Sequence, residues 1–243
     1  MLQRIMDHYW LFSSTRVYYL DTAAMLTYIL AWFGYSAYAQ WNYPRSSNLI
    51  SITTHMRVAW MRNMLARENR MVDASLIGNL LRSITFFAST SIFVLIGLVS
   101  MLGYRDKAVA IIGAVPLAMT TTKFMWEFKI FLMAFVFIYA FFKYTWSMRL
   151  YNYANIYVGA APSAQDCLAR PDETEQYAQR GGALIANAGR HFNMGLRAYY
   201  FGLAVLSWFL HPLLFMMVTC WVVYEVHRRE FRSEAVNNLA EMG

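Results

Sequence analysis

Four long apolar stretches dominate the pattern of hydrophobic and polar positions along the chain. They cover residues 19–41, 83–103, 128–146 and 196–225, and polar segments separate them. A bilayer core about 30 Å thick needs about 20 mostly apolar helical residues to cross it. The pattern therefore predicts an all-α fold, a polytopic membrane helical bundle with about four transmembrane helices in a single domain spanning residues 1–243.

The polar connections carry helical patterns of their own. Residues 48–82 place apolar side chains at helical spacing, which predicts one amphipathic helix lying on or beneath the spans. A second polar helix is expected over about 174–190, and residues 108–122 are too short to span, which favours an interfacial or re-entrant segment. The predicted apolar arc of the first helix comprises Leu49, Ile52, Met56, Trp60, Met64 and Met71.

The last apolar stretch, residues 196–225, contains Pro212 and is predicted to be one tilted or kinked helix. Four crossings place both ends of the chain on one side of the membrane. The positive-inside rule then favours the two long polar connections in the cytoplasm and both termini outside.

Composition agrees with a membrane protein. Hydrophobic residues make up 58% of the chain and charged residues 14%, a surface that water does not solvate. The net charge of +7 is spread over the connections, so we expect anionic lipid headgroups rather than nucleic acid as the partner. The two cysteines, Cys167 and Cys220, lie in unlike environments and indicate no disulfide or metal framework.

The second span is the least apolar, because small and hydroxyl residues recur along it. Such residues let helices approach closely, so this span is expected at the centre of the bundle. Thr85 and Ser89, with Arg82 at the mouth of the span, are also the candidates to line a conduction path. Both interpretations stay open, and the helix contact is the more common one.

The densest polar group of the chain surrounds Asp73. Arg70 and Asp73 are three residues apart and can pair on a helix surface, whereas Arg67 falls on the apolar arc. An anionic headgroup or a carboxylate from another helix is the natural ligand for such arginines.

Ionisable residues at the predicted span ends are further candidates, because charge at membrane depth is costly. Glu127 is favoured as the anchor of a buried network at the start of the third span, with Lys129 beside it. His191, Asn193 and Arg197 form a polar group that caps the last span. No metal-ligand spacing and no catalytic motif is present, so no cofactor, no metal site and no catalytic residue is expected.

Several unusual strings occur in one order along roughly residues 15–235: WMRNMLARENRMVD, FFASTSIF, WEFK, FFKYTWSMRLYNY, GAAP, HFNMGLRAYYF, HPLLF and RREFRS. On these strings the chain resembles a family known as a domain of unknown function, number five-nine-nine. The resemblance implies a multi-pass protein of the bacterial inner (cytoplasmic) membrane. It implies no activity, cofactor or catalytic residue.

Three functions fit the sequence. The first is a homo-oligomeric channel or transporter-like protein for a small ion or solute, with the second span and the arginine-bearing helix lining the path. The alternative is a scaffold or accessory subunit that binds other membrane proteins or anionic lipid through residues 48–82. A membrane enzyme acting on a lipid-like substrate, with Glu127 or His191 as base, is the least supported, so an enzyme is not expected.

Overall fold

The described part of the chain is almost entirely helical and contains no strand, which confirms the all-α prediction. The computed structural model describes residues 2–42, 49–104, 107, 110–111 and 122–232, without the side chains of residues 2–18 and 49–50. The helices are α1 (Leu2–Asn42), α2 (Leu49–Leu65), α3 (Met71–Gly103), α5 (Lys123–Gly159), α6 (Ala164–Ala169), α7 (Pro171–Trp208) and α8 (Pro212–Phe231).

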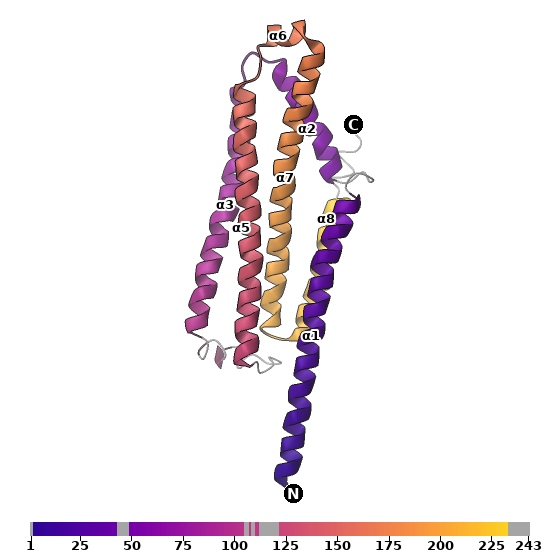
Figure 1. The fold of residues 1–243 in the computed structure, drawn as a ribbon, viewed down its shortest axis with the longest axis vertical. Helices are drawn as coiled ribbons and strands as arrows, with labels where there is room; N and C mark the ends of the chain where they lie inside the picture. The colour runs from indigo at the N-terminus through magenta and orange to yellow at the C-terminus, as the bar shows by residue number, and fades with distance from the viewer. Residues whose placement is uncertain (1, 43–48, 105–106, 108–109, 112–121, 233–243) are drawn as a thin grey trace.

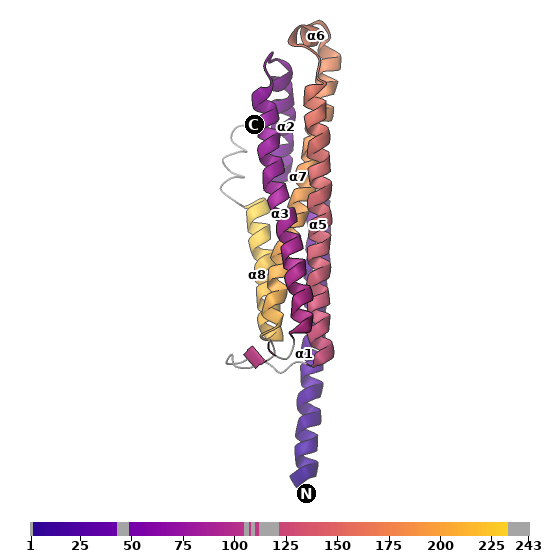
Figure 2. The ribbon, with the colours of Figure 1, turned by 90° about the vertical axis from the view of Figure 1, so that its left-hand side faces the viewer.

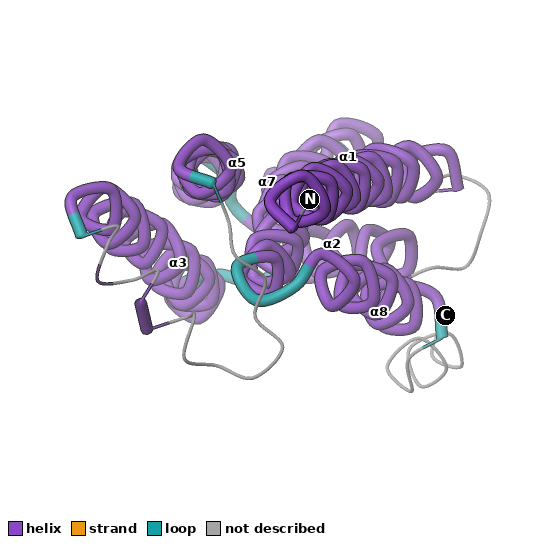
Figure 3. Tube along the Cα trace, turned by 90° about the horizontal axis from the view of Figure 1, so that it is seen from below, coloured by secondary structure: helices purple, strands orange, loops and turns teal. Residues whose placement is uncertain are grey.

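Helix α7 is the centre of the bundle (Figure 1). It packs against α5, α2 and α8, while α1 lies along α8. Seen from below, α3 lies at the edge of the bundle (Figure 3), mainly against α5, and Tyr199 of α7 donates to the carbonyl oxygen of Phe87 on α3 at 2.8 Å. The prediction that the second span occupies the centre is therefore wrong, because α3 packs mainly against a single neighbour, α5.

Small residues explain the central place of α7. Gly181, Ala188, Gly195 and Gly202 recur every seven residues along its sequence. A Cβ atom on Gly195 would lie 2.5 Å from the ring of Tyr144 on α5, so the close approach requires glycine. One turn of α5 is also bonded directly to the α7 backbone, because Ser147 Oγ donates to the carbonyl oxygen of Ala188 at 2.7 Å.

The predicted amphipathic helix over residues 48–82 is two helices. Helix α2 ends at Leu65, and α3 begins at Met71 and continues into the second predicted span. The side chain of Asn69 accepts a hydrogen bond from the backbone of Met71 at 3.0 Å, a local bond that competes with helix continuation. Of the predicted apolar arc, Met64 is buried but Met56 is exposed, because α2 turns its Met61–Met64–Leu65 face to the bundle. Met71 is exposed at the start of α3.

The last predicted span is also two helices rather than one kinked helix. The predicted polar helix and the first part of this span form α7, which ends at Trp208; α8 begins at Pro212 and runs back alongside it (Figures 1 and 2). Proline at the first helical position and the His211 side chain, which accepts from the backbone of Leu213 at 3.1 Å, start the new helix. The ends of α1 and α8, Tyr38 and Phe231, contact each other at 5.8 Å between ring centroids.

This hairpin changes the topology. Residues 196–225, predicted as one crossing, belong to two helices that run in opposite directions (Figure 1). If both helices cross a membrane, the crossings number five rather than four, and the prediction of both termini on one side does not hold. The predicted re-entrant stretch 108–122 lies almost wholly outside the described residues.

Two regions of the bundle differ in surface. Among the described residues, two helices, α3 and α5, have the length and hydropathy to cross a membrane, so the prediction of about four transmembrane helices is not confirmed. The lower half, drawn toward the N-terminus in Figure 1, comprises residues 19–42, 83–103, 123–146, 196–208 and α8. The upper half comprises α2, α6 and residues 71–82, 147–159 and 171–195. Most of the exposed large apolar side chains lie in the lower half, and fewer, such as Leu168 and Met71, lie in the upper half. Those of the lower half include Phe86, Phe93, Ile96, Val99, Phe131, Phe135, Phe142, Leu203, Met217 and Trp221.

Candidate functional site

A buried ion pair joins three helices of the lower half. Lys129 of α5 and Asp21 of α1 are 3% and 4% exposed, and their charged atoms lie 3.9 Å apart. Lys129 Nζ donates to the carbonyl oxygen of Trp208 at 2.9 Å, where α7 ends and the helix dipole favours a cation. Trp208 Nε1 in turn donates to Asp21 Oδ1 at 2.6 Å. The charges therefore hold the end of α7 between α1 and α5.

The residue favoured by the sequence at this position, Glu127, does not anchor that network. Its side chain is 39% exposed and pairs with the exposed Lys123 at 3.8 Å, one turn earlier on the same helix. Lys129 instead lies on the face of α5 that carries the buried Trp126, Ile130 and Met133. The preference for Glu127 over Lys129 is corrected by this geometry.

A second enclosed pair joins α7, α8 and α1. Arg197 Nη2 donates to Glu230 Oε1 at 2.7 Å, and Tyr35 donates through its hydroxyl to Glu230 Oε2 at 2.6 Å. The guanidinium of Arg197 also lies 5.1 Å from the ring centroid of Tyr35. Arg197 thus connects α7 to α8 and α1. Its ion-pair partner is Glu230, not His191 or Asn193, with which the sequence grouped it.

His191 and Asn193 are both half-buried. His191 contacts Trp146 edge-on at 6.3 Å. Burial lowers the pKa of His191, and the charges of Lys143 and Arg190 lower it further. The two neighbouring cations thus favour the neutral form of the His191 imidazole.

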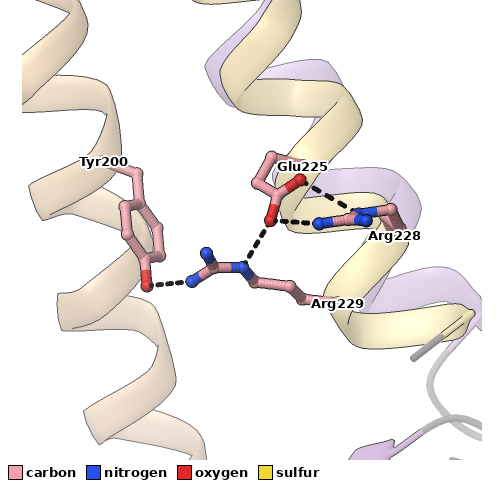
Figure 4. A network of polar contacts seen from close by, with 4 residues as sticks. All are labelled: Tyr200, Glu225, Arg228 and Arg229. Carbon is pink, nitrogen blue, oxygen red and sulfur yellow. Dashed lines mark hydrogen bonds and ion pairs between the residues drawn. The ribbon is translucent and has the colours of Figure 1, made fainter. Parts of the chain in front are cut away.

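Figure 4 shows a surface cluster that joins the last part of α8 to α7. Glu225 accepts from Arg228 at 2.9 and 3.0 Å and from Arg229 at 2.7 Å. Arg229 also donates to the hydroxyl of Tyr200 on α7 at 3.0 Å. One carboxylate and two guanidinium groups leave a net positive charge at this point of the boundary between the two halves.

In the upper half, Asp73 is fully buried and collects two donors. Trp60 Nε1 lies 2.7 Å and Arg67 Nη1 lies 2.9 Å from its Oδ1 atom. The predicted pair between Arg70 and Asp73 is wrong, because Arg70 turns away and donates to the carbonyl oxygens of Ala161 and Pro162. Arg67, which the helical arc left unexplained, is thus the charge partner of Asp73 across the α2–α3 turn.

An exposed pair joins α2 and α7 near the top of the bundle. Arg62 donates to Glu175 through Nε at 2.7 Å and Nη2 at 2.5 Å, a bidentate arrangement. The hydrogen bonds from Arg62 and Gln179 lower the pKa of Glu175 to about 2. Both side chains are nearly half exposed, so water screens this pair.

The polar residues predicted to line a path lie on the outer surface of α3. Thr85 and Ser89 are exposed, and the Thr85 hydroxyl donates to the carbonyl oxygen of Leu81 on its own helix at 2.9 Å. Arg82 is exposed and donates to Asn79. The space between α3, α5 and α7 is filled by rings that contact one another: Phe87, Tyr144, Phe192 and Tyr199.

Sequence analysis missed the partners of the buried charges. Tyr35, Trp208 and Glu230 come from helices far apart in the chain, and no local spacing connects them to Arg197 or Lys129. The described residues bring together no group of three or more side chains that could hold a metal ion.

Comparisons with known proteins add a family but no activity. A family model described as a protein of unknown function, DUF599, matches residues 23–235. No curated protein and no solved structure matches the chain.

Proposed function

The chain belongs to the DUF599 family, whose function is unknown, and on that premise we propose that it is an integral protein of the bacterial inner membrane that works as a scaffold binding anionic lipid. The lower half crosses the bilayer, and the upper half extends into the cytoplasm. Five helices make the crossing: α1, α3, α5, α7 and α8.

The observation that carries this proposal is the contrast between surface and interior in the lower half. Large apolar side chains such as Phe93 and Phe131 are 72% and 60% exposed there. The charges of Asp21 and Lys129, by contrast, are enclosed and paired. Apolar outside and paired charges inside is the arrangement that hydrocarbon requires, because an unpaired charge in lipid is costly.

The arrangement favours a scaffold over a conduction path within one chain. Ring side chains fill the contact of α3, α5 and α7, while the hydroxyls of Thr85 and Ser89 lie on the outer surface. Cationic side chains, including Arg228 and Arg229, lie where the two halves meet. Such a position suits contact with the phosphates of an anionic leaflet. Each cationic side chain near such a leaflet contributes about 1 kcal/mol to the free energy of attraction.

Cysteine labelling in sealed membranes tests the proposal. The two native cysteines are replaced (Cys167→Ser, Cys220→Ser). Single cysteines are then placed at positions 93 and 131 in the lower half and at positions 63 and 165 in the upper half, all four exposed. An impermeant maleimide should label the upper pair in inverted vesicles only and leave the lower pair unlabelled until the protein is denatured.

Each outcome separates the proposal from its competitors. Reaction at 93 or 131 in sealed membranes would contradict a lipid-facing lower half, since both positions are open to solvent in a water-soluble protein. Labelling of 63 and 165 only from the outside would reverse the proposed orientation. Ion flux through liposomes containing the purified protein would restore the channel hypothesis.

A further inference from the structure

A groove runs between α1 and α5 in the lower half. Its volume is about 290 Å³, near the lower limit of ligand sites in proteins. The lining is mostly aromatic and aliphatic, with two polar side chains from α1: Tyr28, Ile29, Trp32, Phe33, Ser36, Gln40, Leu132, Phe135 and Tyr139.

The base of the groove is rigid and its edges are open. Trp32 stacks on Phe201 of α7 with centroids 5.6 Å apart and meets Tyr139 edge-on at 5.8 Å. Phe33 and Phe135, which belong to the two sides, are 66% and 61% exposed. A preformed wall of fixed rings binds a flexible apolar chain with little ordering cost to the protein.

The two ends of the groove differ in charge. Below it, Asp21 and Lys129 neutralise each other. Above it, the ammonium of Lys143 lies 5.1 Å from the ring of Tyr139, which lines the groove. Within the described residues, no carboxylate comes within 4 Å of this ammonium, so Lys143 is a cation without an acidic partner.

The polar groups of α1 and α5 lie at similar heights above the buried Asp21–Lys129 pair. Lys143 is 14 residues beyond Lys129 on α5, and Ser36 is 15 residues beyond Asp21 on α1. At 1.5 Å per residue these positions lie about 21 and 22 Å above the buried pair. Gln40 lies one turn higher, and a lysine at this depth reaches toward the interface.

We propose that this groove is a lipid site: it holds an acyl chain of an anionic phospholipid, whose phosphate is bound by Lys143 with Ser36 and Gln40 beside it. The inference rests on the proposed membrane function and names the lipid class and its place. Because Lys143 has no acidic partner, the site should bind an anionic headgroup more tightly than a zwitterionic one. Because the groove is lined by rings, it should bind a phospholipid more tightly than free phosphate.

Native mass spectrometry of the full chain in detergent tests the site with phosphatidylglycerol, phosphatidylcholine and inorganic phosphate as probes. We expect phosphatidylglycerol to bind about fivefold more tightly than phosphatidylcholine, because one lysine near a membrane surface contributes about that factor. Inorganic phosphate alone should not bind measurably. Equal binding of the two lipids, or binding of free phosphate, would overturn the proposed recognition.

Matched variants locate the binding. Lys143→Gln should remove the fivefold preference, whereas Lys107→Gln, a lysine 5.8 Å from the ring of Tyr104 at the other end of the bundle, should retain it. Ser36→Phe should fill the groove and weaken both lipids at least tenfold, since displacing about two methylene groups is sufficient. Ser89→Phe on the exposed surface of α3 should leave both affinities unchanged.

A second variant tests the groove in case Ser36→Phe does not fold. Phe33→Ala truncates a side chain that is 66% exposed, so the bundle tolerates it, and it should weaken both lipids severalfold. If Phe33→Ala and Ser36→Phe both bind like Ser89→Phe, the groove is not the site. The labelling experiment on positions 93 and 131 would still support membrane insertion in that case, so the two proposals fail separately.

Discussion

Two ion pairs of similar composition show how the two halves of the molecule differ. In the lower half, Lys129 and Asp21 are enclosed at 3% and 4% exposure and tied to Trp208. In the upper half, Arg62 and Glu175 pair bidentately but remain nearly half exposed. The upper pair has the shorter contact, 2.5 Å against 3.9 Å. The distance between the charged atoms therefore does not show which pair contributes more to stability.

Solvent exposure, rather than distance, decides which of the two ion pairs matters more for stability. Water screens the upper pair and competes for its hydrogen bonds, so breaking it leaves both partners solvated. The lower pair has no such alternative, because removing one charge leaves the other enclosed. The comparison predicts that the importance of a charged residue in this protein follows burial rather than hydrogen-bond length.

The strongest test of the comparison is Lys129→Met. Leaving Asp21 without its cation should lower the free energy of unfolding by about 3–5 kcal/mol, measured by denaturation in mixed micelles. Lys123→Met on the same helix is the control, because that side chain is 71% exposed. The double variant Asp21→Asn with Lys129→Met should recover most of the loss. Equal effects of Lys129→Met and Lys123→Met would refute the ranking by burial.

Arg197→Met should come next. It removes the partner of Glu230, whose side chain is 16% exposed, so partial solvation limits the loss to about 2–4 kcal/mol. The same unfolding assay applies, with Arg228→Met as the exposed control. An Arg197→Met protein as stable as the control would show that Tyr35 alone satisfies Glu230.

Glycine substitutions test whether burial also decides the effect of a change that involves no charge. Gly182→Ala would bring a Cβ atom within 2.7 Å of the Val58 Cα atom, so α2 must move away from α7 at a cost of about 1–3 kcal/mol. Gly78→Ala on α3 meets nothing within 4 Å and should stabilise by about 0.5–1 kcal/mol through helix propensity. Thermal unfolding of both variants should therefore shift in opposite directions. An unchanged or raised melting temperature for Gly182→Ala would show that α2 does not approach α7 this closely.

The smallest effect is expected from Arg62→Gln. Arg62 and Gln179 hold the pKa of Glu175 at about 2, below its ordinary 4.5, so the carboxylate is ionised at neutral pH. Its contribution is complete above pH 4.5 and disappears as the pH falls through about 2. Melting curves at pH 6 and near pH 2 should show a slight difference from the wild type only at pH 6. A large loss at pH 6 would contradict the screening argument.

Sequence reasoning worked best for the general class of helix. The apolar stretches at 83–103 and 128–146 lie within α3 and α5, which among the described residues combine the length and the hydropathy of a membrane span. The helix breaks were missed because Asn69 and Pro212 each permit either a continuing or a new helix, and the choice depends on tertiary partners. The seven-residue spacing of small residues in α7 was a visible sign of the central helix.

Candidate residues in the lower half could not be ranked from periodicity. When both the packed and the exposed faces of a helix are apolar, the pattern does not say which way Glu127 or Lys129 points. In the upper half, Arg67 and Asp73 meet only because a turn intervenes between α2 and α3. Whether any candidate residue binds a ligand stays a prediction.

The unbroken length of α7 has a mechanical consequence. Its 38 residues form a rod about 57 Å long that enters both halves, with α5 fixed alongside by Ser147. Tilting such a rod by about five degrees about its lower end displaces its tip by about 5 Å. In the proposed membrane arrangement, a change in the packing of the lipid around the lower half would thus be amplified, by simple leverage, into motion at the upper tip of α7.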